Sequence, residues 1–152
     1  MHYPDDNFLL DTETARSLYH LYASPMPLVD YHCHVSPREI AEDRRYRTIT
    51  EVWLGGDHYK WRAMRGNGVD EAFITGNAPD REKFRKFAET MPALIGNPLH
   101  LWAHLELKRF FDIDLLLGPD TADEIYDRCS EALQEPDFSV RNLIQRSRVE
   151  VL

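Results

Sequence analysis

Two histidines that are separated by one residue, His32 and His34, are the first side chains whose types and spacing suit metal chemistry. The apolar residues that precede them predict a strand over residues 28–34. Because successive side chains of a strand point to opposite faces, both imidazoles then share one face with Asp30. Neutral imidazoles are good ligands for zinc and neighbouring divalent ions. The pattern therefore indicates a metal-binding pair, with ordinary packed, hydrogen-bonded histidines as the alternative.

A second group of polar and aromatic side chains follows Asp57, which is a good N-cap for a helix over residues 58–65. Helical spacing places His58, Arg62 and Arg65 on one side of that helix. Taken alone, Trp61, Arg62 and Arg65 are more typical of a solvated amphipathic face than of a binding site.

The residues after the histidine pair indicate how its strand ends. Ser36, Pro37 and Glu39 match a helix N-cap, a proline at the first helical position and the glutamate of a capping box. A strand that stops before a helix leaves the histidines at its carboxyl end, where α/β barrels carry their active sites. Cys33 falls on the opposite face of the strand, so we expect its side chain in the core.

Capping residues and apolar periodicity predict a mostly helical chain around this strand. The expected N-caps are Asp11 or Thr12, Ser36, Thr50, Asp57, Asn97, Thr121 and Ser139. A further helix is expected from Asp80 to Ala93, with an apolar stripe of Phe84, Phe87, Ala88 and Met91, and a solvated turn is expected at residues 43–45. The final Val149, Val151 and Leu152 indicate the opening of a second strand. A crossover this long is unusual, so two interpretations follow: a helical domain with one short strand, or the beginning of a larger α/β protein. The apolar ending favours the second.

Composition narrows the class of protein. Hydrophobic residues make up 43% of the 152 residues, which is enough to bury a core. A net charge of −8, from 18 basic and 26 acidic residues, provides no basic patch for nucleic acid. Cys33 and Cys129 form no CxxC motif, so reduced thiols are expected. No signal peptide or membrane-spanning run is visible, and we expect a cytoplasmic protein without a membrane partner.

Several strings of this sequence resemble uronate isomerase, also called glucuronate isomerase. They are DYHCH at 30–34, WLGGDHYKWR at 53–62, ITG at 74–76, and NPL at 97–99 followed by HLEL at 104–107. The resemblance covers essentially the whole chain and implies the amidohydrolase superfamily of metal-dependent (β/α)₈ TIM barrels. It implies an N-terminal fragment of that α/β fold, with a helix and the first barrel strand over 1–35. A helical insertion over 36–147 and the start of the second strand over 148–152 would follow.

The resemblance also implies roles for individual residues. His32 and His34 become ligands of a divalent metal, for which zinc is expected. Asp30, on the same predicted strand face, would orient one of these ligands, with a buried hydrogen-bonded carboxylate as the alternative. A carboxylate from a late barrel strand normally completes that site, so we expect this chain alone to bind metal weakly. Tyr59 is the candidate for proton transfer and His58 for catalysis and substrate contact, while Arg62 is a candidate contact for the substrate's negative charge. His100 and His104 lack the glutamate of a metalloprotease motif and are interpreted as packing or helix-surface residues.

The implied reaction is an aldose–ketose isomerisation of a small-molecule hexuronate. D-glucuronate would be converted to D-fructuronate, and D-galacturonate to D-tagaturonate, through an enediol, by the complete protein rather than by this chain alone. The resemblance is compatible with a homo-oligomer. Two alternatives belong to other classes: a metal-dependent hydrolase of the amidohydrolase type, because His-x-His also serves water activation, and a non-enzymatic helical module.

Overall fold

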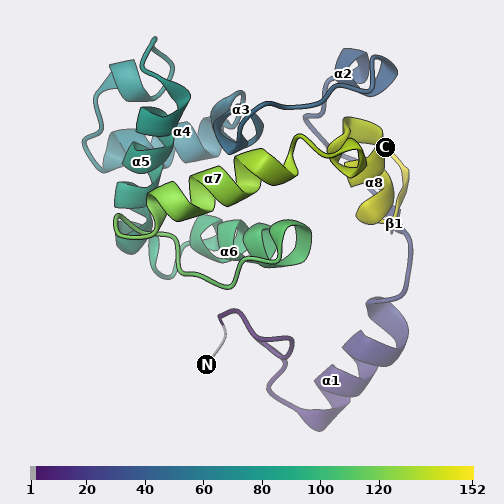
Figure 1. Ribbon diagram of the computed structural model, residues 1–152. Coiled ribbons are helices and arrows are strands. Elements are labelled where there is room, and N and C mark those ends of the chain that lie inside the picture. Colours follow the sequence, from purple (N-terminus) through teal and green to yellow (C-terminus); the bar gives the residue numbers. More distant parts are fainter. Residues whose placement is uncertain (1–2) are drawn as a thin grey trace.

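The computed structural model describes residues 3–152 and is built mainly of helices (Figure 1). In chain order the elements are α1 (Glu13–Leu18), η1 (Tyr19–Ala23), β1 (Leu28–Val29), α2 (Pro37–Ala41), α3 (Ile49–Leu54), α4 (His58–Gly66), η2 (Glu71–Phe73), α5 (Asp80–Thr90), η3 (Met91–Leu94), α6 (Pro98–Phe111), α7 (Ala122–Ala132), η4 (Pro136–Phe138), α8 (Val140–Arg146) and β2 (Val149–Val151). The predicted helical character is confirmed. Within residues 3–152 no barrel is seen, and none of the helices is long and apolar enough to cross a membrane.

The hydrophobic core lies among α3, α5, α6 and α7. Helix α7 runs between α6 on one side and α3, α4 and α5 on the other (Figure 1). Phe84 and Phe87 of α5 are fully buried. The Trp53 ring of α3 stacks on Phe84 at 6.0 Å between centroids and meets Phe87 edge-on at 5.8 Å. Each buried aromatic side chain contributes roughly 1.5–3 kcal/mol by leaving water. This packing fixes the end of α3, from which the candidate site begins.

Local capping chemistry determines where several helices start. The side chains of Thr12, Asp57, Asn97 and Ser139 all accept a hydrogen bond from a backbone N–H in the first turn that follows, as predicted. Such caps satisfy amides that have no partner within the helix. The start of α4 is therefore determined by Asp57.

One predicted cap is misplaced, and two lack the expected side-chain bond. The N-cap of α3 is Thr48, two residues earlier than the expected Thr50, whose hydroxyl instead donates to the Asp80 carbonyl. Ser36 and Thr121 occupy the N-cap positions of α2 and α7 as predicted, but neither side chain accepts a hydrogen bond from a helix amide. The Thr121 hydroxyl instead donates to the Leu116 carbonyl at 2.6 Å. For Thr50 and Thr121, the hydroxyl is therefore engaged by a partner that the capping motif does not include.

The strand predicted over 28–34 is much shorter in the structure. β1 contains only Leu28 and Val29, and it pairs in parallel with β2. The ladder ends where the Asp30 amide donates to the Val151 carbonyl at 2.8 Å. A strand extends only as far as a partner satisfies its backbone groups, and β2 ends at Val151. The alternation argument consequently does not apply to the histidines.

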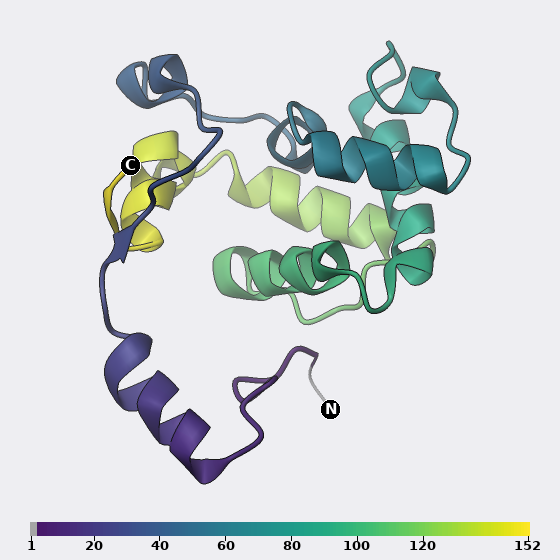
Figure 2. The same cartoon turned by 180° about the vertical axis from the view of Figure 1, so that it is seen from behind.

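The β1–β2 pair lies beside α8, away from the helical core, and the segment with α1 and η1 extends from it (Figure 2). Arg141 of α8 ties this region to α2. Its backbone amide donates to Asp43 Oδ1 at 3.0 Å and its Nε donates to the Ile40 carbonyl at 2.8 Å. The Val140 amide donates to the Arg44 carbonyl at 2.9 Å. These bonds attach α8 to α2 and to the loop that follows α2. A cavity lies between α8 and α3.

Candidate functional site

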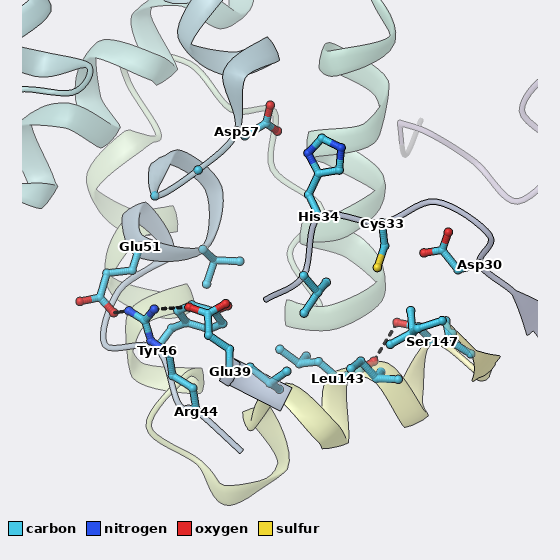
Figure 3. Close-up of a pocket in the computed structure, with 18 of the residues that line it drawn as sticks. Asp30, Cys33, His34, Glu39, Arg44, Tyr46, Glu51, Asp57, Leu143 and Ser147 are labelled. Carbon is cyan, nitrogen blue, oxygen red and sulfur yellow. Dashed lines mark hydrogen bonds and ion pairs between the residues drawn. The ribbon is translucent and has the colours of Figure 1, made fainter. Parts of the chain in front are cut away.

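A cavity of about 880 Å³ lies between the segment after β1, the α3–α4 turn and α8 (Figure 3). It brings together the two groups of side chains that the sequence singled out. The segment after β1 contributes Asp30, His32, Cys33, His34 and Val35, and the α3–α4 turn contributes Gly55, Gly56, Asp57, His58 and Tyr59. Apolar side chains of α8 form the opposite wall, including Leu143.

The two imidazoles of the histidine pair converge although they do not lie on a strand. The Nε2 atoms of His32 and His34 are 3.1 Å apart, and both side chains are exposed. The Asp30 carboxylate accepts a hydrogen bond from the His32 amide at 3.2 Å. This contact over two residues is typical of an Asx turn, which bends the backbone away from strand geometry. The turn therefore replaces the strand as the local cause of the convergence.

The donor set of this pair fits a divalent metal. Two nitrogens at about 2.05 Å from a tetrahedral zinc ion are about 3.3 Å apart, close to the spacing between the Nε2 atoms. Residues 3–152 contain no group of three or more His, Cys, Asp or Glu side chains arranged to hold a metal ion. Catalytic zinc usually has three protein ligands. The pair therefore offers two imidazole nitrogens, fewer than the usual number of protein ligands at such a site.

Asp57 organises the first turn of α4 with both of its carboxylate oxygens. Oδ1 accepts from the amides of Tyr59 at 2.8 Å and Lys60 at 3.1 Å, and Oδ2 pairs with Lys60 Nζ at 2.7 Å. Burial alone would raise the pKa of Asp57, but the hydrogen bonds and charge of Lys60 lower it below its usual value. Asp57 is consequently a carboxylate at neutral pH.

His58 and Tyr59 lie on the exposed first turn of α4 at the mouth of the cavity. The His58 ring meets the Trp61 ring edge-on at 5.0 Å between centroids. Trp61 is itself anchored, because its Nε1 donates to the Leu54 carbonyl at the end of α3 at 2.8 Å. The Tyr59 side chain is 63% exposed and free to face a ligand.

The two arginines of α4 have different surroundings. The Arg62 guanidinium lies 5.7 Å from the centroid of the Tyr59 ring and does not line the cavity. Arg65 is engaged by Glu71, with its Nε donating to Oε2 at 2.8 Å. Arg62 is therefore the arginine whose charge lies beside the tyrosine.

An ionic group forms the floor of the cavity, and the sequence did not reveal it. Arg44 pairs with Glu39 and lies 3.6 Å from Glu51, while the Tyr46 hydroxyl donates to Glu39 at 3.1 Å (Figure 3). Burial and the Glu39 charge raise the pKa of Tyr46. The sequence suggested a solvated turn for Arg44 and a capping role for Glu39. No local pattern could correct this, because the partners come from separate elements.

Other cysteines and histidines occupy distinct environments. Cys33 is exposed and lines the cavity, so its predicted core position is wrong; β1 ends before Cys33 and does not direct its side chain inward.

His104 is buried, with Nδ1 2.6 Å from the His100 carbonyl and Nε2 accepting from the Leu117 amide at 2.9 Å. These bonds satisfy both ring nitrogens, and the predicted packing role of His104 is confirmed.

Comparison with known proteins identifies the family of this chain. The family model described as glucuronate isomerase matches residues 1–152. The chain belongs to the glucuronate isomerase family. It is 60% identical to the uronate isomerase of Lachnospira eligens over 148 residues, covering 97% of this chain and 32% of that protein. It is 56% identical to the uronate isomerase of Bacteroides thetaiotaomicron over 149 residues, again covering 97% and 32% of the two chains.

Solved structures of the glucuronate isomerase family share this fold. The crystal structure of uronate isomerase from Thermotoga maritima matches with a TM-score of 0.90 at 32% identity, covering 100% of this chain and 33% of that one. Glucuronate isomerase from Caulobacter crescentus matches with a TM-score of 0.87 at 26% identity, covering 100% and 34%. The chain thus spans about a third of the length of the relatives it matches. The mostly helical architecture is that of the matching third.

Proposed function

We propose that this chain supplies the histidine pair and the proton-transferring tyrosine of a hexuronate isomerase. The proposed reactions are conversion of D-glucuronate to D-fructuronate and of D-galacturonate to D-tagaturonate. The observation that carries the proposal is the shared cavity, in which the convergent His32–His34 pair lies with His58 and Tyr59. Family membership supports the same reaction class. We also propose that the complete protein is cytoplasmic and forms a homo-oligomer. Residues 1–35 and 148–152 would belong to the barrel, and residues 36–147 would form a helical insertion between them.

Aldose–ketose isomerisation moves a proton between two adjacent carbons through an enediol. Tyr59 would carry that proton on its hydroxyl. The Arg62 guanidinium lies beside the Tyr59 ring, 5.7 Å from its centroid. From there Arg62 would attract the substrate carboxylate.

His58 and the histidine pair would orient the substrate. His58 lies on the first turn of α4 and lines the cavity, so its ring would contact the sugar acid. His32 and His34 would hold a divalent metal, for which we propose zinc, with Asp30 keeping the backbone of the pair bent. When bound, such an ion polarises a carbonyl oxygen. Binding by this chain alone would be weak, because its set of ligands is incomplete.

A chimera tests this proposal directly. This chain would replace the matching segment of the Lachnospira eligens uronate isomerase, and ketose formation from D-glucuronate would be followed. Tyr59→Phe should lower kcat by about 100-fold or more, because it removes the proton carrier. Tyr22→Phe is the matched control, since Tyr22 is 62% exposed and lies outside the cavity. An unsubstituted chimera that hydrolyses an ester or amide but forms no ketose would overturn the isomerase in favour of the hydrolase.

A further inference from the structure

A buried ionic cluster lies directly beneath the first turn of α4. Lys60 is only 8% exposed, its Nζ lies 2.7 Å from Asp57 Oδ2, and it is 5.8 Å from the centroid of the Trp53 ring. The Trp53 indole Nε1 in turn donates to Glu106 Oε2 at 2.6 Å. The cluster therefore joins the end of α3, the start of α4 and the middle of α6.

Burying a lysine is costly unless its charge is compensated, so this arrangement needs a reason. Asp57 provides the connection to the candidate site, because the carboxylate that pairs with Lys60 also accepts from the Tyr59 amide. The charge of Lys60 thus holds the carboxylate that orients the first turn. Glu106 limits the movement of the Trp53 ring on which the cluster rests.

We propose that Lys60 and Glu106 are positioning residues that hold His58 and Tyr59 in place at the mouth of the cavity. Neither residue lines the cavity, so neither acts on a ligand directly. The part of this inference that concerns turnover rests on the proposed isomerase function. The part that concerns the placement of Tyr59 stands on the contacts alone.

Glu106 reports the state of the cluster. Burial raises the pKa of Glu106 and the Asp57 charge adds to this, whereas the Lys60 charge and the Trp53 hydrogen bond oppose it. Replacing Lys60 with methionine keeps an unbranched side chain that is one atom shorter and removes its charge. The pKa of Glu106 should therefore rise further in Lys60→Met, because the lowering effect of the Lys60 charge is lost.

Lys86 is a matched control. It pairs with Glu89 three residues away at 2.8 Å and lies 5.8 Å from the centroid of the Phe73 ring, so its local contacts resemble those of Lys60. It lies on α5, outside the cavity. Lys86→Met should thus reproduce the loss of a lysine–carboxylate pair without disturbing α4.

The first experiment uses the 152-residue chain and NMR. The Trp53 indole proton should titrate with Glu106, the titration should vanish in Glu106→Gln, and its midpoint should rise in Lys60→Met but not in Lys86→Met. The ring signals of His58 and Tyr59 should shift in Lys60→Met and return in Lys60→Arg, which restores the charge. Unchanged His58 and Tyr59 signals in a folded Lys60→Met chain would overturn the positioning role.

The second experiment uses the chimera with D-glucuronate. Lys60→Met should lower kcat about tenfold or more through misplacement of Tyr59, Lys60→Arg should recover most of it, and Lys86→Met should leave it unchanged. Zinc binding by the histidine pair should be the same in all of them. If the chimera is active and its kcat does not respond to Lys60→Met, the positioning role is overturned. If the unsubstituted chimera is inactive, the proposed function is overturned, and the NMR experiment alone tests the positioning role.

Discussion

Replacing Trp61 with phenylalanine tests how the aromatic residues of α4 hold the candidate site together. The substitution keeps a ring but removes the indole N–H that donates to the Leu54 carbonyl at 2.8 Å. Losing one such bond costs about 1 kcal/mol, and more when the acceptor stays unsatisfied. Trp61 is partly buried, and the smaller phenylalanine ring would bury less apolar surface, which costs roughly 1 kcal/mol of stability. We therefore expect the free energy of unfolding to fall by about 2 kcal/mol.

For a chain of this length, that loss lowers the Tm by about 4–8 °C. Thermal unfolding followed by circular dichroism measures it, and NMR of the His58 ring shows whether the edge-on contact at 5.0 Å survives. Trp102→Phe is the matched control, because Trp102 is 53% exposed and surface changes stay within about 0.5 kcal/mol. A Trp61→Phe chain that unfolds at the same temperature as Trp102→Phe, with unchanged His58 signals, would refute this account of the anchor.

Three further predictions concern the metal pair, the core and a surface carboxylate. Calorimetric titration of the chain with zinc should show weak binding that is lost in His32→Ala and kept in His20→Ala; tight stoichiometric binding in His32→Ala would contradict it. Phe84→Ala should lower the free energy of unfolding by about 3–5 kcal/mol in urea titrations, because Phe84 is fully buried. The hydrogen bonds of Arg65 and Thr75 lower the pKa of Glu71 to about 2, so its stabilisation is present above its usual pKa and lost as the pH falls toward 2. Arg65→Met should move the NMR titration midpoint of Glu71 upward, and an unchanged midpoint would exclude the ion pair as its cause.

Sequence patterns identified the histidine pair correctly as a convergent group but explained it by the wrong backbone. Alternation along a strand predicted that His32 and His34 share a face. In the structure, an Asx turn at Asp30 brings their Nε2 atoms to 3.1 Å instead. The strand was predicted too long because its length depends on β2, which is more than a hundred residues away in the chain.

The sequence by itself determined features whose partners lie within one helical turn. Asp57 caps α4 and Asn97 caps α6 because each accepts from amides two or three residues ahead, and such bonds need no tertiary neighbour. The apolar stripe of α5 likewise predicted the burial of Phe84 and Phe87.

Only the tertiary structure decided features that depend on how separate elements pack against one another. Nothing in the local spacing predicted the burial of Lys60, yet it is buried against Trp53 and lies close to the Trp53–Glu106 hydrogen bond. Arg44 looked like part of a solvated turn, yet it lies at the floor of the cavity between two glutamates. The physical reason is that a charged side chain is enclosed only where other elements pack over it, and no local spacing specifies which elements those are.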